Sequence, residues 1–342
     1  MAEPAVGARP GLAGMRRAWA PATLLATICP FVLAVWLAPT AGAAPVAALT
    51  WLLFVGSSVH VAATGWFYTV PEVRAHMFSH RARYLWTPAA LVAGLAATAP
   101  LLSASALTAV LLAFFAWQFF HFQKQNLGVA ALAARSSGSG VLTQWERRAL
   151  AAAGVGGIVG LIGHPTLLQL ATNRHYDLVF DLGAIVFGAA ALFGIAAVLG
   201  RPARSRSPGF ALLYLSGLIF FLPVFVFSSP YAAVAGLTIA HGLQYLLLIT
   251  LLAAAPGTGG SAGISMLVLI NVALLLGLAL NRASHLHDAT GIGRAVFGAY
   301  LGLSTAHFIV DAGLWRLRDE FPRAFLTRRL PYLLATPAST EA

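Results

Sequence analysis

Long apolar stretches recur along the whole chain, separated by short segments rich in glycine, proline, serine and arginine. A helix needs about 20 mostly apolar residues to cross a bilayer. Stretches of this kind predict an all-α fold, a transmembrane bundle of about ten helices, and the loops of up to about 25 residues are too short for a separate soluble core. The predicted spans cover roughly residues 19–38, 46–69, 85–102, 105–123, 149–171, 178–199, 209–227, 231–254, 263–280 and 294–315.

Composition supports a membrane location. The 342 residues are 59% hydrophobic and 9% charged, whereas a soluble domain carries roughly 25% charged residues. The first run, Ala20–Leu37, exceeds the roughly 7–15-residue apolar core of a signal peptide, so we expect it to remain as the first span. The single cysteine, Cys29, excludes a disulfide framework or a cysteine-based metal site within one chain.

Positive charge is distributed unevenly between the predicted loops. With ten spans, 18 of the 21 Lys and Arg residues fall on the side that holds both termini, and only Arg174, Arg282 and Arg294 fall on the other. Cytoplasmic loops carry such an excess, so we predict an inner (cell) membrane protein with both termini cytoplasmic. The chain would form one integral membrane domain, with tails at 1–18 and 316–342 flanking a bundle at 19–315. The net charge of +11 then reflects how the chain is oriented in the membrane and not nucleic-acid binding.

Four of the predicted spans each carry a histidine within a polar stripe. Residues three and four apart share a helix face, and polar groups in hydrocarbon face the bundle interior or a wet cavity. The stripes are Ser57, His60, Thr64 and Tyr68; Gln118, His121 and Gln125; Thr238, His241 and Tyr245, with Gln244 beside them; and Tyr300, Ser304, His307 and Asp311. At a rise of 1.5 Å per residue, His60, His241 and His307 are expected near the midplane, and His121 some two turns nearer the cytoplasm.

These stripes predict a metal centre. Neutral imidazole nitrogens bind iron, copper or zinc, and a carboxylate can complete the ligand set. We favour iron, with haem held by two histidines as the alternative. The expected chemistry is oxidation of a hydrophobic lipid or isoprenoid that enters from the bilayer. The expected metal ligands are His60, His121, His241 and His307. Asp311 is expected either to bind the metal or to orient His307. The residues expected to position water or substrate are Tyr245, Gln244, Tyr68 and Gln118.

A second candidate metal site follows the second span. Glu72, His76 and His80 are spaced four residues apart, and an H-x3-H pair on a helix can clasp one ion. The segment "HMFSH" resembles one histidine box of the membrane di-iron desaturases and hydroxylases, which implies an iron site at a cytoplasmic helix end. The alternative is a basic amphipathic helix whose charges lie among the lipid headgroups.

The four span histidines also resemble the general plan of the bacterial carotene-cleaving dioxygenases. That resemblance implies a non-haem iron held by histidines from several helices, and it carries no individual residue role across. Two other functions use the same stripes. A proton-coupled transporter would use them as a path, favoured by a broken helix such as "FLPVFVFSSPYAAVAG" (221–236). A membrane scaffold or assembly factor would use them as hydrogen bonds between helices. The oligomeric state stays open.

Overall fold

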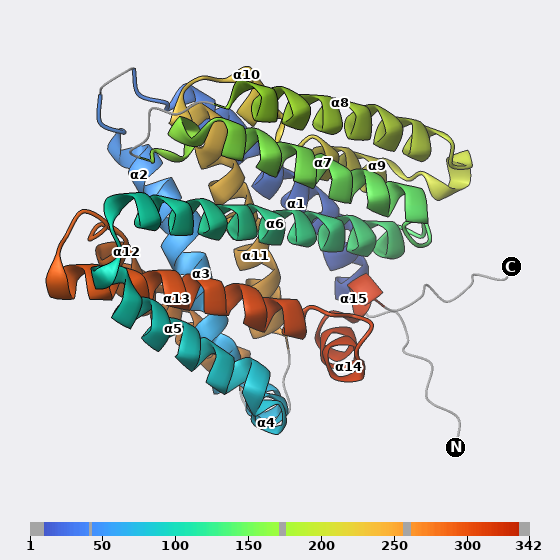
Figure 1. Ribbon diagram of the computed structural model, residues 1–342. Helices are drawn as coiled ribbons and strands as arrows, with labels where there is room; N and C mark the ends of the chain where they lie inside the picture. Colours follow the sequence, from blue (N-terminus) through green and yellow to red (C-terminus); the bar gives the residue numbers. More distant parts are fainter. Residues whose placement is uncertain (1–9, 41–42, 171–175, 256–260, 335–342) are drawn as a thin grey trace, which may run out of the picture.

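The computed structural model confirms the all-α fold (Figure 1). It describes residues 10–40, 43–170, 176–255 and 261–334, so parts of both predicted tails and Arg174 lie outside the described residues. The α-helices are α1 (Pro10–Trp36), α2 (Ala47–Phe54), α3 (His60–Ala63), α4 (Pro71–Ser79), α5 (Thr87–Thr98), α6 (Ala104–Ser136), α7 (Gln144–Gly163), α8 (Asp177–Leu199), α9 (Pro208–Leu218), α10 (Leu222–Val226), α11 (Gly236–Ala254), α12 (Ala262–Ser284), α13 (Gly291–Leu314), α14 (Glu320–Arg329) and α15 (Pro331–Leu334).

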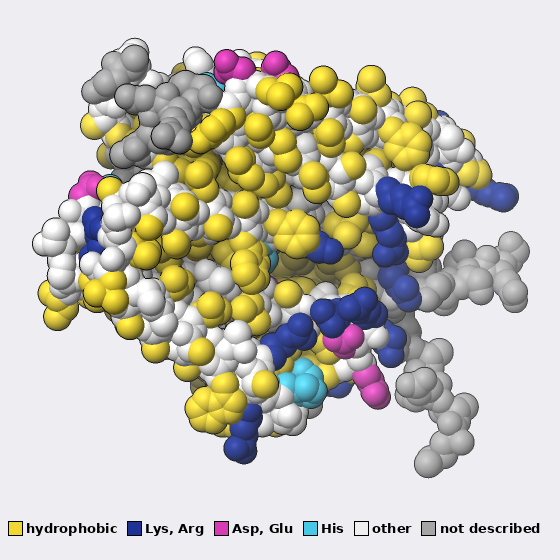
Figure 2. All heavy atoms as spheres, in the orientation of Figure 1, with side chains coloured by type: hydrophobic (Ala, Val, Ile, Leu, Met, Phe, Trp, Pro, Cys, Tyr) yellow, Lys and Arg dark blue, Asp and Glu magenta, His cyan; other side chains and the backbone are white. Residues whose placement is uncertain are grey.

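Eight helical segments in the described part of the chain are long and apolar enough to cross a membrane. Large apolar side chains such as Trp36, Leu101 and Leu192 are exposed on the outside of the bundle, and Figure 2 shows hydrophobic side chains over most of one face. Such a surface suits contact with lipid. The eight segments are Gly14–Trp36, Ala47–Thr69, Ala82–Leu101, Ala104–Ser136, Asp177–Leu199, Tyr231–Ala254, Ala262–Ser284 and Gly291–Leu314.

Two of the ten predicted spans take a different form. The run at 149–171 becomes α7, which begins earlier at Gln144, followed by the short turn η5 (Pro165–Leu168). The run at 209–227 is divided into α9 and α10 at residues 219–221, just before Pro223. In a continuous helix the Pro223 ring would clash with the carbonyl of Ile219, four residues earlier, and Pro223 has no N–H to bond it, which accounts for the break after Leu218. The structure therefore supports a multi-span bundle with eight long apolar helical segments in its described part.

The span that carries His60 is an irregular helix. Between α2 and α3 lies the π-helical segment η1 (Val55–Val59), and after α3 the chain tightens into the 3-10 segment η2 (Thr64–Thr69). The glycines Gly56 and Gly242 let η1 approach α11 closely, because a Cβ on Gly242 would lie 2.6 Å from the Gly56 Cα. This backbone contact holds the His60 and His241 segments together.

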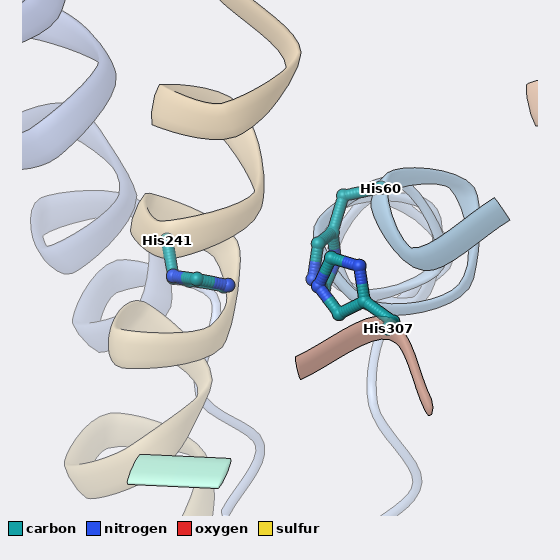
Figure 3. Close-up of side chains that lie close together, drawn as sticks. All are labelled: His60, His241 and His307. Carbon is teal, nitrogen blue, oxygen red and sulfur yellow. The ribbon is translucent and has the colours of Figure 1, made fainter. Parts of the chain in front are cut away.

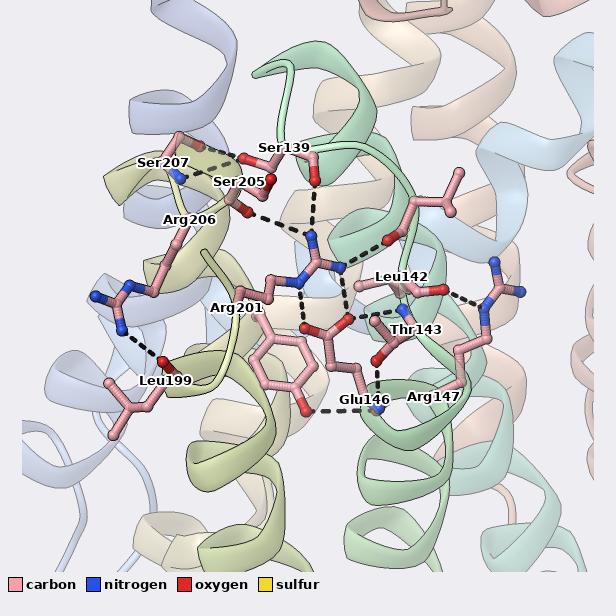
Figure 4. Close-up of polar contacts among 12 residues, drawn as sticks. Ser139, Leu142, Thr143, Glu146, Arg147, Leu199, Arg201, Ser205, Arg206 and Ser207 are labelled. Atoms are coloured by element: carbon pink, nitrogen blue, oxygen red, sulfur yellow. Dashed lines mark hydrogen bonds and ion pairs between the residues drawn. The ribbon is translucent and has the colours of Figure 1, made fainter. Parts of the chain in front are cut away.

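A buried ion pair joins two loops at one end of the bundle (Figure 4). Glu146, fully buried at the start of α7, accepts hydrogen bonds from Arg201 Nε at 2.5 Å and from its Nη2 at 2.6 Å. Arg201 also donates to the carbonyl of Ser139, and Glu146 forms a capping box with Thr143. The pair thus ties the α6–α7 connection to the α8–α9 connection. Figure 2 shows Lys and Arg side chains gathered towards this end of the molecule.

Candidate metal centre

Three histidines from three helical segments point toward one another in the interior (Figure 3). His60 on α3, His241 on α11 and His307 on α13 are buried, with 2%, 0% and 3% of their surfaces exposed. One nitrogen from each ring lies within 4.8 Å of the others. The polar stripes of these spans therefore do meet in a shared, buried interior.

His121 on α6 joins the same cluster. Its ring centroid lies 4.9 Å from that of His241 and 5.1 Å from that of His307, so it does not lie two turns away from them as the sequence depths suggested. The reason is the length of α6, which continues through Lys124 to Ser136 and is 33 residues long. The predicted span ended at residue 123. Because that end was too early, His121 was expected too close to the cytoplasmic side.

Asp311 completes a second, overlapping group with His121 and His307. The Asp311 Oδ2 atom lies 3.7 Å from His307 Nε2 and 4.0 Å from His121 Nε2, and the three ligand atoms again lie within 4.8 Å of one another. Because His307 belongs to both groups, the four histidines and the carboxylate form one continuous cluster.

Most of the histidine nitrogens of this cluster lack a hydrogen-bond partner in the protein. Buried polar atoms nearly always make a hydrogen bond, yet six ring nitrogens here are buried with no partner in hydrogen-bonding geometry: both of His60, both of His241, and the Nε2 atoms of His121 and His307. A nitrogen in this state can accept a metal ion. Ligands of a metal at about 2.1 Å lie roughly 3–4 Å apart, and the ligand atoms of each three-residue group, within 4.8 Å of one another, lie close to that spacing.

Hydrogen bonds around the cluster orient its members. Thr64 Oγ1 lies 2.6 Å from His307 Nδ1 and 2.6 Å from the Tyr245 hydroxyl. Tyr245 in turn donates to Asp311 Oδ1 at 3.2 Å. With its Nδ1 engaged by Thr64, His307 directs Nε2 at the cluster, which is the arrangement that metal-binding histidines commonly adopt.

Aromatic rings cover two of the imidazoles, a feature that the stripes did not reveal. Phe122 stacks on His241 with centroids 3.9 Å apart, and Phe308 stacks on His121 at 4.7 Å. Each phenylalanine directly follows one of the cluster histidines in the sequence, which is the only signal that could have found them. Each ring covers one face of the imidazole on which it stacks.

Other predicted positioning residues lie differently. The Gln244 amide accepts a hydrogen bond from Gln125 at 2.9 Å and donates to Thr27 at 2.8 Å, so its polar atoms join α11 to α6 and α1. Tyr68 donates to the carbonyl of Tyr84 at 2.8 Å. Gln118 is half-buried and makes no hydrogen bond to another residue in the described ranges. The structure therefore brings Tyr245 to the cluster and leaves these three residues outside its hydrogen bonds.

The candidate metal-binding groups among the described residues do not include Glu72, His76 or His80. Glu72 is paired with Arg328 at 2.5 Å and with Arg329 at 3.1 Å. His76 stacks on Phe321 with centroids 4.1 Å apart, and burial together with the neighbouring His80 lowers its pKa. This segment docks α4 on α14, and its carboxylate already has two cationic partners.

Comparison with protein-family models, with curated proteins and with solved structures finds no match to this chain. The function is therefore inferred from the geometry of the cluster.

Proposed function

We propose that this multi-pass membrane protein is a metal-dependent oxidoreductase whose metal, by preference iron, is held by the four span histidines. The observation that carries the proposal is the set of six buried imidazole nitrogens without protein partners. Hydrogen bonds that served only to join helices would have paired these nitrogens with each other or with the backbone. His60, His121, His241 and His307 are the proposed ligands, with Asp311 as a further ligand or an orienting group.

The ring packing favours one small ion over a haem. His60 lies in edge-to-face contact with His241 at 4.9 Å and with His307 at 5.1 Å, which leaves no room for a macrocycle between them. A set of histidines with a carboxylate is typical of non-haem iron centres, and a bound iron ion supplies redox and oxygen chemistry. In this proposal, Thr64 and Tyr245 hold His307 and Asp311 in place and form a hydrogen-bonded chain through which a proton can pass.

The substrate class follows from the surroundings. The cluster lies inside helices whose outer surfaces are apolar, so a lipid or isoprenoid can reach it laterally without leaving the bilayer. We propose the cell membrane as its location. We also propose ten spans with both termini cytoplasmic, with α7 as the fifth span and α9 with α10 as the seventh, since this arrangement puts most of the arginines on one side.

Elemental analysis of the purified protein tests the metal proposal. We expect near-stoichiometric iron, and strong loss of metal in His241→Ala and His307→Ala. His287→Ala is the matched control, because His287 is an exposed histidine in the α12–α13 loop. Wild-type protein without stoichiometric iron, copper or zinc, after reconstitution with each, would falsify the proposal.

A proton-coupled transporter is the second candidate, favoured by the irregular span that carries His60. Interruptions of this kind mark ion paths in transporters. This candidate predicts proton or solute flux into liposomes by protein that holds no metal, with flux lost in His60→Ala. Metal-bound protein that shows no flux would exclude it.

A further inference from the structure

An apolar groove opens on the outside of the bundle beside the histidine cluster. It has a volume of about 530 Å³ and is lined by Arg83, Trp117, Phe120, Phe308, Ile309 and Ala312. Its walls are therefore α6 and α13, with Arg83 from the segment that precedes α5. Figure 2 shows a hollow between these two helices, with histidine surface visible in its depth.

The Phe308 ring lies between the groove and His121 of the cluster. The Phe308 ring, part of the groove wall, stacks on the His121 imidazole. The side chain of His121 is 10% exposed, compared with 2% for His307. His121 is therefore the member of the cluster that a molecule lying in the groove would approach first.

Two cations lie near the groove: Arg83 lines it, and Lys124 contacts one of its wall residues. Arg83 makes no ion pair with a carboxylate in the described part of the chain, while the nearby Asp319 is shared by Arg316 and Arg318 at 3.7 Å and 3.9 Å. The Lys124 ammonium lies 5.4 Å from the centroid of Phe120, another wall residue. Arg83 also lines a second, more polar cavity of about 580 Å³ together with His76, His80 and Asp319. It thus stands where apolar and polar surroundings meet.

Resting on the proposed function, we propose that this groove binds a long-chain carboxylate, a free fatty acid, as the substrate. The carboxylate lies between Arg83 and Lys124, and the chain crosses Phe120, Trp117 and Phe308. A cation that has Tyr84 as a side-chain partner but no carboxylate partner in the described part of the chain, at the end of an apolar trough, is complementary to an anionic head on an apolar tail. A volume of this size suits one small ligand, and therefore one acyl chain in preference to a two-chain phospholipid.

The position of Arg83 also indicates which part of the chain meets the cluster. The Arg83 side chain packs on Gly313, since its Cδ lies 3.1 Å from where a Gly313 Cβ would stand. Gly313 and His307 are separated by roughly 9 Å along α13 at 1.5 Å per residue. The carbon beside His121 and His307 therefore belongs to the carboxyl-proximal half of a long chain.

Fluorescence quenching by brominated lipids tests this proposal. Full-length protein in nanodiscs is titrated with dibromostearic acid, with its methyl ester, or with a brominated phosphatidylcholine, and Trp117→Phe identifies the quenching that arises in the groove. We expect saturable quenching by the acid and about tenfold weaker binding of the ester, because a charged hydrogen-bonded pair is lost. Arg83→Gln should weaken acid binding about tenfold, and Ala312→Phe should abolish it by filling the groove.

Arg81→Gln is the matched control, because Arg81 is exposed and its side chain bonds the Phe78 carbonyl and lies over the Phe78 ring. It should leave acid binding unchanged. Equal binding of acid and ester, quenching by the phospholipid alone, or acid binding unaffected by Arg83→Gln would each overturn the proposal. The same titration on His241→Ala, which should hold no metal, separates the two proposals. If the acid binds although neither the wild type nor the variant holds metal, the groove assignment stands and the oxidoreductase proposal fails. If the wild type holds metal but does not bind the acid, the oxidoreductase proposal stands and the groove assignment fails.

Discussion

At the scale of single residues, the hydroxyl of Thr64 holds the centre together, because it contacts both His307 and Tyr245 at 2.6 Å. Thr64→Val keeps the shape of the side chain but leaves His307 Nδ1 without its partner. Loss of such an orienting contact typically costs 10–100-fold in metal affinity, and we expect a loss of that size here. Thr64→Ser should keep the affinity. A competition titration against a chelator measures it, and Thr98→Val, at an exposed threonine of α5, is the control. Unchanged affinity in Thr64→Val would show that the hydroxyl does not position His307.

Helical spacing predicted the residues of the cluster better than it predicted their contacts. The stripes contained His60, Thr64, Tyr245, His307 and Asp311, and all five lie together, because a shared face fixes the direction of a side chain from the helix axis. The same spacing was silent on hydrogen-bond partners. Gln244 lies on the buried side of α11, yet its amide hydrogen-bonds to Gln125 and Thr27 and not to the cluster. Partner choice depends on the neighbouring helices, which one sequence does not place.

At the scale of helices, the contact between η1 and α11 sets the distance from His60 to His241. Gly242→Ala adds a methyl group that would lie 2.6 Å from the Gly56 Cα, so the two segments must separate. Overpacking of this kind costs about 1–3 kcal/mol, and we expect a lower unfolding temperature together with weaker metal binding. Gly188→Ala on α8 is the control, since its Cβ would meet no atom within 4 Å and it should be neutral or stabilising. Equal behaviour of the two variants in a thermal unfolding assay would contradict this account.

Element boundaries were the weaker part of the sequence prediction. Hydropathy located the apolar runs, but α6 continues past Lys124 to Ser136 because the residues there remain compatible with a helix. The opposite error occurred at 209–227, where an unbroken apolar run contains the break before Pro223. Hydropathy measures burial in lipid and carries no information on backbone continuity, so proline and helix propensity have to be weighed separately.

At the scale of the whole molecule, the number of spans decides which side each loop occupies. If α7 and the α9–α10 pair do not cross, Arg201, Arg204 and Arg206 move to the outer face, against the positive-inside rule. The Glu146–Arg201 pair argues in the same direction as that rule, because it joins the α6–α7 loop to the α8–α9 loop and so puts both on one side. An eight-span arrangement, in which α7 does not cross and α8 does, would place these two connections on opposite sides.

Labelling of single cysteines distinguishes the two topologies. In a Cys29→Ala background, Ala203→Cys lies in the exposed α8–α9 connection and Thr290→Cys in the exposed α12–α13 connection. With ten spans, a membrane-impermeant maleimide added to intact cells should label position 290 and reach position 203 only after lysis. Because α7 and the α9–α10 pair precede the loop at 290, removing both crossings leaves its side unchanged and reverses only the side of position 203. Labelling of position 203 in intact cells would therefore refute the ten-span topology while leaving the histidine cluster untouched.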